Sequence, residues 1–236
     1  MLRKFAIDAC LVVRGVRSAY LVDAVYPPEP ARVFSGLLGA LRKKCKSFEN
    51  VVFWSHIPSM QSFLVNVHLV EQKLSDFEVG AFIQLDGSCA ILTAAPPGLA
   101  EVLKETYAVS SASPDKASFS LPNHLSQEIL VPLAAVLIDY PVGYVPSSSQ
   151  GMGFLGGETL DVYELLLKAS QAPNLTSGDH ILLKFSCPRA LTDGHPELAP
   201  DNMMEKLRIK FMPRLANVGM QLSAVHTVET FNRVAL

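Results

Sequence analysis

The stretch Ile83-Gln84-Leu85-Asp86-Gly87-Ser88-Cys89-Ala90-Ile91-Leu92 decides the fold class of this 236-residue chain. Two short apolar runs flank Asp86-Gly87, and an Asp-Gly pair supplies the positive φ angles that a tight turn between antiparallel strands needs. Such a hairpin argues against a purely parallel sheet. The stretch therefore predicts a sheet that is at least partly antiparallel.

Hydrophobic periodicity extends this prediction along the chain. Apolar positions at helical spacing predict helices over residues 2–14, 31–46, 97–107, 123–138 and 201–215. Short apolar runs predict strands over residues 19–25, 51–55, 62–70, 141–145, 160–167, 180–187 and 222–231. The Ser-, Ala- and Pro-rich residues 108–122 predict a loop and a possible internal boundary. The sum is a single-domain, mixed α/β fold, in which helices pack on a partly antiparallel sheet.

The composition indicates a chain with a large core. Charged residues make up 18% of the chain and hydrophobic residues 49%, whereas an ordinary soluble domain has about 25% charged residues. Such a chain collapses, which excludes intrinsic disorder. Because strands that are nearly continuous apolar runs are usually covered on both faces, we expect helices or a second chain over both faces of the sheet.

Several classes of partner and location are also excluded. No apolar run reaches the roughly 20 residues of a membrane span. The net charge of −2 removes the electrostatic argument for a nucleic-acid partner. The four cysteines form no CxxC or CxH pair, which argues against structural zinc and favours reduced, buried thiols. We expect a cytoplasmic or nuclear protein with no cofactor and no bound metal.

One glycine-rich segment is the best candidate for a ligand site. Residues 151–156 match GxGxxG, a pattern in which glycines let the backbone approach a pyrophosphate. Pro146 and three serines separate the pattern from the preceding strand, so a flexible loop is the simpler explanation. If the segment does bind a small anion, the candidate ligand-binding residues are Asp139, Tyr144, Ser149, Gly151, Gly153, Gly156, Gly157 and Glu158. Asp139 and Asp161 could also approach a divalent cation, although ordinary surface carboxylates are the simpler explanation.

The sequence assigns no catalytic residues. The six histidines share no metal-ligand spacing, and there is no GxSxG motif. His68 and His226 lie in β-like runs, where a structural role is expected, and Cys187 at a strand end is only a weak nucleophile candidate. We therefore predict a binding or interaction protein with a protein partner or a second copy of itself. The alternative is an enzyme or sensor that binds a small anionic ligand, such as a nucleotide, at residues 147–157.

Three segments of the C-terminal part carry a family resemblance. They are Tyr140-Pro-Val-Gly-Tyr144, Phe154-Leu-Gly-Gly-Glu-Thr-Leu-Asp-Val-Tyr163 and Leu182-Leu-Lys-Phe-Ser-Cys-Pro188. In this order, and with the chain end Arg233-Val-Ala-Leu236, they resemble an uncharacterised eukaryotic family named after open reading frame 74 of human chromosome 1. The resemblance covers residues 140–236 and implies a eukaryotic, intracellular, soluble protein. That family has no assigned reaction, so the resemblance brings no catalytic residue to this chain.

Overall fold

The computed structural model describes residues 2–75, 80–86, 88–147, 155–169, 179–216 and 218–231. The chain divides into two compact units. Unit 1 comprises Met1–Glu78 and Ala95–Asp139, and unit 2 comprises Val79–Ala94 and Tyr140–Leu236. The mixed α/β class is confirmed, since helices and both parallel and antiparallel strand pairs occur. The single-domain organisation stays a prediction.

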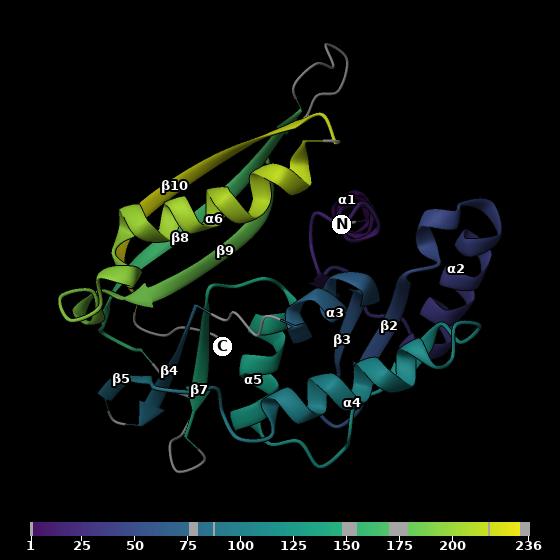
Figure 1. Ribbon diagram of the computed structural model, residues 1–236, viewed down its shortest axis with the longest axis horizontal. Helices are drawn as coiled ribbons and strands as arrows, with labels where there is room; N and C mark the ends of the chain where they lie inside the picture. Colours follow the sequence, from purple (N-terminus) through teal and green to yellow (C-terminus); the bar gives the residue numbers. More distant parts are fainter. Residues whose placement is uncertain are drawn as a thin grey trace. The chain divides into compact units, whose positions relative to one another are not determined.

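Unit 1 is built on a four-stranded sheet in the order β1-β3-β2-β6 (Figure 1). β3 pairs antiparallel with β1 and with β2, whereas β6 pairs parallel with β2. The strands are β1 (Ala19–Leu21), β2 (Val51–His56), β3 (Gln61–Asn66) and β6 (Ser118–Ser120). The helices are α1 (Leu2–Val13), α2 (Pro30–Lys44), α3 (Val67–Ser75), α4 (Leu99–Ser111) and α5 (Gln127–Leu137), with the short 3-10 helix η1 (Lys46–Phe48).

Helices cover both faces of this sheet. Phe53 of β2 lies in a core with Phe34 of α2 and Val12 of α1, and the rings of Phe34 and Phe53 stack at 4.9 Å. The next residue, Trp54, points to the opposite face. There its Nε1 donates a hydrogen bond of 2.9 Å to Ser110 Oγ on α4. The expectation of a sheet covered on both faces is confirmed for unit 1, and the cover is the chain's own helices.

Unit 2 contains two three-stranded sheets, in the orders β5-β4-β7 and β10-β8-β9. The strands are β4 (Ala81–Asp86), β5 (Ser88–Leu92), β7 (Val142–Pro146), β8 (Thr159–Ala169), β9 (His180–Pro188) and β10 (Met220–Thr230). The helical elements are η2 (Arg189–Leu191), η3 (Pro196–Leu198) and α6 (Pro200–Leu215). α6 packs against β10 and lies across the sheet of β8, β9 and β10 (Figure 1).

The predicted hairpin is confirmed as the antiparallel pair of β4 and β5. The register runs from Phe82 opposite Leu92 to Asp86 opposite Ser88, and Gly87 lies outside the described residues. β7 adds to the other side of β4 in parallel, so this sheet is mixed. None of the helices in the described ranges has the length and apolarity needed to cross a bilayer.

Two predicted boundaries are wrong. The strand predicted over residues 62–70 ends at Asn66, because the side-chain oxygen of Asn66 accepts the Leu69 N–H at 3.3 Å and caps α3. Residues 108–122 are not one loop, since α4 continues to Ser111 and β6 forms a parallel pair with β2. The first error comes from a cap inside an apolar run, and the second from pairing between distant segments.

Candidate functional site

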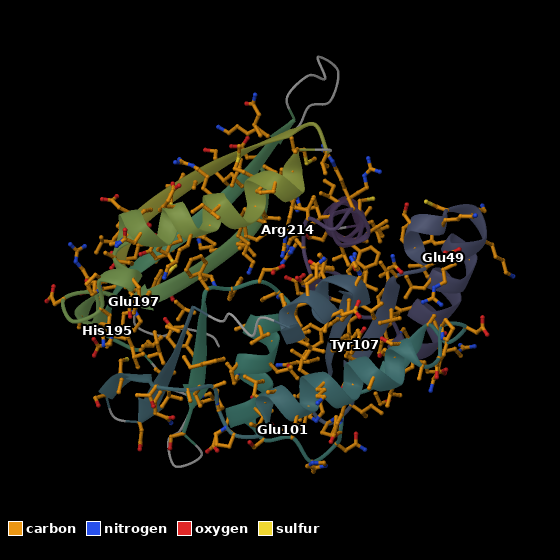
Figure 2. All side chains as sticks on the ribbon, viewed as in Figure 1. Glu49, Glu101, Tyr107, His195, Glu197 and Arg214 are labelled. Atoms are coloured by element: carbon orange, nitrogen blue, oxygen red, sulfur yellow. The ribbon has the colours of Figure 1, made fainter. Side chains whose placement is uncertain are left out.

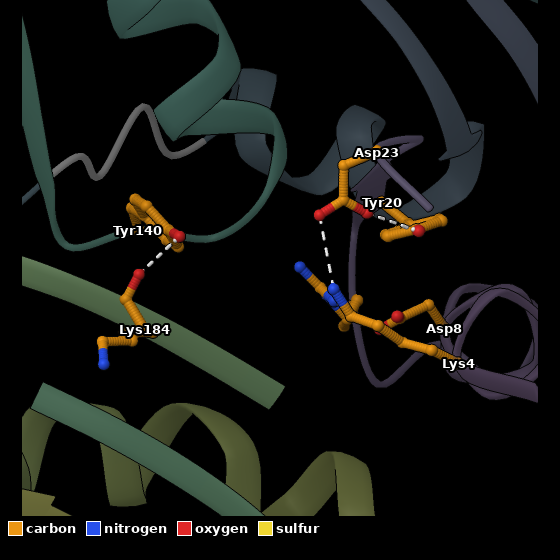
Figure 3. A network of polar contacts seen from close by, with 7 residues as sticks. Lys4, Asp8, Tyr20, Asp23, Tyr140 and Lys184 are labelled. Atoms are coloured by element: carbon orange, nitrogen blue, oxygen red, sulfur yellow. Dashed lines mark hydrogen bonds and ion pairs between the residues drawn. The ribbon is translucent and has the colours of Figure 1, made fainter. Parts of the chain in front are cut away.

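Tyr144 joins the two sheets of unit 2. It lies on β7, and its hydroxyl donates a hydrogen bond of 3.0 Å to the backbone oxygen of Ser186 on β9. Tyr140 donates in the same way to the backbone oxygen of Lys184, at 2.6 Å (Figure 3). Burial raises the pKa of Tyr144 above its ordinary value, so the hydroxyl stays protonated at neutral pH. Tyr144 therefore ties two strands together.

Gly156, Gly157 and Glu158 belong to the turn that leads into β8. Gly157 has a φ of +81°, which glycine adopts without strain, and its N–H donates a hydrogen bond of 2.9 Å to the carbonyl of Phe231. The Glu158 side chain is exposed, and its charge adds to the effect of burial in raising the pKa of Cys89 on β5. The other three candidate residues, Ser149, Gly151 and Gly153, lie outside the described residues.

Asp139 belongs to unit 1, where it forms a buried ion pair. Its side chain is 0% exposed, and its Oδ1 lies 3.0 Å from Nζ of Lys73 on α3. The backbone N–H and the hydroxyl of Ser18, just before β1, donate to the two carboxylate oxygens at 2.7 and 3.0 Å. Lys73 also donates to the carbonyl of Val136 on α5. These contacts give Asp139 a structural role: it ties α3, β1 and the end of α5 together.

A second buried carboxylate, that of Asp161 on β8, lies beside two basic side chains. Asp161 Oδ1 is 2.8 Å from Nε2 of His226 on β10 and 3.6 Å from Nη1 of Arg189 in η2. The Asp161 side chain is 2% exposed, that of His226 26% and that of Arg189 54%. The sequence predicted no such pair, because 65 residues separate Asp161 from His226. The alternation of side chains along a strand could have indicated which residues share a face. It does not show that Asp161 and His226 are neighbours unless the register of β8 with β10 is known.

Tyr163 packs beside this carboxylate. Its ring stacks on Phe185 at 4.9 Å and tilts against the ring of His226 at 5.1 Å. Burial, and then the charge of Asp161, raise the pKa of Tyr163 above its ordinary value. Among the described residues, its buried hydroxyl has no hydrogen-bond partner. Because an Asp–His pair can hold a proton and an orphan hydroxyl can bind water or a ligand, we take Asp161, Tyr163 and His226 as the candidate site.

Two thiols adjoin the candidate site. Cys187 on β9 is directly opposite Asp161, and burial raises the pKa of its thiol to about 12, with smaller effects from Asp161 and Cys89. Burial and Glu158 also raise the pKa of Cys89. Since the thiolate is the nucleophilic form, these environments oppose nucleophilic catalysis by Cys187.

Unit 1 contains a cavity of about 250 Å³. Its polar lining includes Arg42, Glu49, His68, Glu71 and Tyr107, of which Glu49 and Tyr107 are labelled in Figure 2. The Arg42 guanidinium donates to three backbone carbonyls, at 2.8, 3.0 and 3.4 Å. His68 Nδ1 lies 3.6 Å from Glu71 Oε2. The Arg42 side chain, which lines this cavity, therefore has a structural role in binding the backbone.

Comparisons with known proteins do not identify this chain. No family model, curated protein or solved structure matches the chain. Within the described part of the chain, no group of three or more His, Cys, Asp or Glu side chains is arranged to hold a metal ion.

The Asp139 ion pair gives the first testable prediction. We expect Asp139→Ala to lower the free energy of unfolding of unit 1 by about 3–5 kcal/mol, because it removes the charge opposite the largely buried Lys73. Asp139→Asn should cost less, since the amide oxygen still accepts from Ser18 and Asn tolerates the φ of +69°. Urea unfolding monitored by the fluorescence of Trp54, the single tryptophan, reports on unit 1.

As a control, Lys4→Ala breaks the exposed Lys4–Asp23 pair (Figure 3) and should cost less than about 1 kcal/mol. Equal losses for Asp139→Ala and Lys4→Ala would show that the buried Asp139 pair stabilises the fold no more than an exposed pair does.

The thiols give the second prediction. We expect a maleimide at neutral pH to label the exposed Cys10 and Cys45 rapidly, and Cys187 at least ~100-fold more slowly. The physical reason is that burial both shields the Cys187 thiol and keeps it protonated. Peptide mass spectrometry over a time course measures each rate, and urea-unfolded protein serves as the control in which all four thiols react. Labelling of native Cys187 as fast as Cys10 would mean that an accessible thiolate exists there.

Proposed function

We propose that this chain is a binding protein without a catalytic centre of its own, and that it takes up an extended polypeptide segment along the outer edge of β10. The observation that carries this proposal is the exposure of the strand. β10 has eleven residues, and each is either exposed or intermediate in burial. A strand that is long, regular and exposed is a ready template for another strand.

The position of β10 in its sheet supports the proposal. β10 pairs with β8 over its whole length, from Met220 opposite Ala169 to Thr230 opposite Thr159, without a register shift. In the part of the chain that the structure describes, no strand pairs with the other side of β10. The row of backbone N–H and C=O groups on that side is therefore available for strand addition.

The other edge of the same sheet is protected, which makes β10 stand out. The edge strand β9 carries the exposed Lys184, and its register with β8 shifts at Leu165/Leu166. Two of its carbonyls also accept hydrogen bonds from tyrosine hydroxyls, those of Tyr140 and Tyr144. Lysines and bulges on an edge are devices that keep other chains away.

β10 has none of these devices. Its sequence, MQLSAVHTVET, contains no Lys, Arg or Pro, and Glu229 is its one carboxylate. Val225 and Val228 are 42% and 47% exposed. Strand addition draws affinity from main-chain hydrogen bonds and specificity from alternate side chains. The preferred segment should therefore have small or β-branched residues opposite Val225 and apolar residues opposite Leu222 and Val228.

The candidate site has a supporting role in this proposal. The hydrogen bond between Asp161 and His226 joins β8 to β10 through side chains, in addition to the backbone ladder. The Tyr163 ring packs against the same histidine. An edge strand anchored in this way keeps its outer backbone groups in place for a partner, which lowers the entropic cost of binding.

The test is a peptide selection. We expect phage-displayed twelve-residue peptides selected on the immobilised chain to share alternating apolar positions and to shift the backbone amide resonances of β10. Val225→Lys should weaken their binding at least ~10-fold, because a charge in the middle of the edge blocks apolar pairing. Fluorescence anisotropy measures the affinities.

The matched control is Val109→Lys, the same substitution at a position on α4 that is 58% exposed. It should leave peptide binding unchanged. Peptides that shift resonances only outside β10, or that bind Val225→Lys as well as the wild type, would contradict the proposed edge site.

A second candidate function is favoured by Arg189. It is that of an enzyme or sensor that binds a small anionic ligand, such as a nucleotide, at residues 147–157. Arg189 is 54% exposed and lies in η2, which contacts β5. Cys89 of β5 is in turn influenced by the charge of Glu158. Arg189 and Glu158, which follows the turn at Gly156 and Gly157, thus both lie near β5, and a cation near this turn supports an anion site there.

A thermal-shift assay tests this second candidate. If ATP or inorganic phosphate binds there, it raises the apparent melting temperature, because a ligand that binds only the native state stabilises it. Arg189→Met and Gly156→Val should then abolish most of the shift, whereas Arg208→Met, at an exposed arginine of α6, should not. If neither compound shifts the wild-type protein, the anion-site candidate is wrong.

We also propose a family and a cellular location for this chain. Membership of the family named after open reading frame 74 of human chromosome 1 is supported by the three segments between Tyr140 and Pro188. A cytoplasmic or nuclear location is supported by the four cysteines, none of which is paired in a disulfide.

A further inference from the structure

We infer that the segment accepted by β10 is β10 of a second copy of this chain, so that two three-stranded sheets join edge to edge around a twofold axis. This inference rests on the proposed function, because it names the partner of the same edge. When two identical strands pair antiparallel, the sequence of each strand lies opposite its own reverse. The inference is supported because the side chains of β10 are compatible with those of its reversed sequence.

Symmetry restricts the register of such a pair. A twofold axis normal to the sheet leaves every side chain on its own face, and residues directly opposite each other in an antiparallel pair share a face. Opposed residues must therefore both be even-numbered or both be odd-numbered, so one residue lies opposite its own copy, with the axis midway between the two copies. For the strand Met220–Thr230, overlap is complete only when this residue is Val225. Each shift of the axis to a neighbouring residue leaves two positions of each strand unpaired.

In this register the strand is complementary to itself. The opposed pairs are Met220–Thr230, Gln221–Glu229, Leu222–Val228, Ser223–Thr227, Ala224–His226 and Val225–Val225. Glu229, the one acidic residue, faces the amide of Gln221, so no like charges are opposed. The apolar Leu222 and Val228 meet twice on one face, and the two copies of Val225 meet on the other face. Directly opposed side chains are the unit of contact between neighbouring strands, and the Ser223–Thr227 pair is of a kind that stabilises them.

The contact supplies as many main-chain hydrogen bonds as a typical protein interface. Eleven opposed positions in an antiparallel pair form about ten main-chain hydrogen bonds, and a typical protein interface contains about the same number. A foreign segment would have to match this length and pattern by coincidence. A second copy matches both at every position and is always present at the concentration of its target.

The test uses charges placed on the symmetry axis. Val225 is 42% exposed, and the residue opposite it on β8, Glu164, is already paired with Lys184, so a charged side chain of either sign at position 225 is compatible with the folded monomer. In a pair of Val225→Lys chains or of Val225→Glu chains, two like-charged side chains start from Cβ atoms about 5 Å apart. In a mixture of the two variants, Lys faces Glu.

We expect the wild type to sediment as a dimer, at twice the chain mass of 25.6 kDa. Each variant alone should sediment as a monomer, with a dimer Kd raised at least ~30-fold, and an equimolar mixture should recover a one-to-one dimer. The recovery itself demonstrates that both variants fold. Val109→Lys, on α4, should remain dimeric.

Three results would overturn the inference: a wild type that is monomeric at about 100 µM, a dimer that survives both substitutions, and variants that stay monomeric when mixed. Its failure is distinguishable from failure of the proposed function. If the wild type is monomeric but binds selected peptides at β10, the second copy is not the partner, whereas β10 remains a binding edge. Absence of peptide binding at β10, with a dimer insensitive to residue 225, rejects both.

Discussion

A strand in a sheet satisfies its backbone hydrogen bonds on two sides, and β10 has a strand neighbour on one side only among the described residues. The edges of the unit 1 sheet, β1 and β6, have three residues each and offer almost no template. β9 is longer, but Lys184 and two tyrosine hydroxyls obstruct it. β10 combines length, regular pairing and the absence of lysine or proline. Among these four edge strands of the described residues, β10 therefore has the features of a template for another strand.

The buried charges of the two units act as ties between distant parts of the chain. Asp8 lies 2.7 Å from Arg17 with both side chains nearly inaccessible, Asp139 pairs with Lys73, and Asp161 pairs with His226. A buried charge is costly unless it is paired, so each carboxylate permits only the arrangement in which its partner is present. In a chain with 18% charged residues, these pairs specify positions that apolar packing alone would leave less defined.

Local patterns predicted those elements that short-range chemistry determines. The Asp86-Gly87 turn predicted the β4–β5 pair, and the apolar runs located the long strands β8, β9 and β10 to within two residues. The end of β3 could not be predicted, because the hydrogen bond that the Leu69 N–H donates to the Asn66 side-chain oxygen divides a continuous apolar run into a strand and a helix. β6 was missed because three residues carry no periodic signal, and its pairing with β2 depends on the fold.

The candidate site could be predicted from local sequence patterns even less completely than the fold. Tyr144 and Glu158 could be proposed from their proximity to a glycine-rich pattern, and both lie in unit 2, whereas Asp139 lies in unit 1. The contact between Asp161 and His226 depends on a strand register across 65 residues, which no local spacing encodes. Local sequence can therefore propose chemical groups, but it brings them together only when the pairing of strands is known.

Strand alternation also separates the two roles of β10. His226 points to the face of the sheet that holds Asp161 and Tyr163, since it is directly opposite Tyr163 in the register. Val225, the adjacent residue, points to the other face, opposite Glu164. A substitution at Val225 therefore alters the outer edge without touching the hydrogen bond that anchors the strand. The side chain of residue 225 and the anchoring hydrogen bond of His226 lie on different faces of one strand, so the loss of association on substitution of Val225 can be measured apart from the loss of the fold.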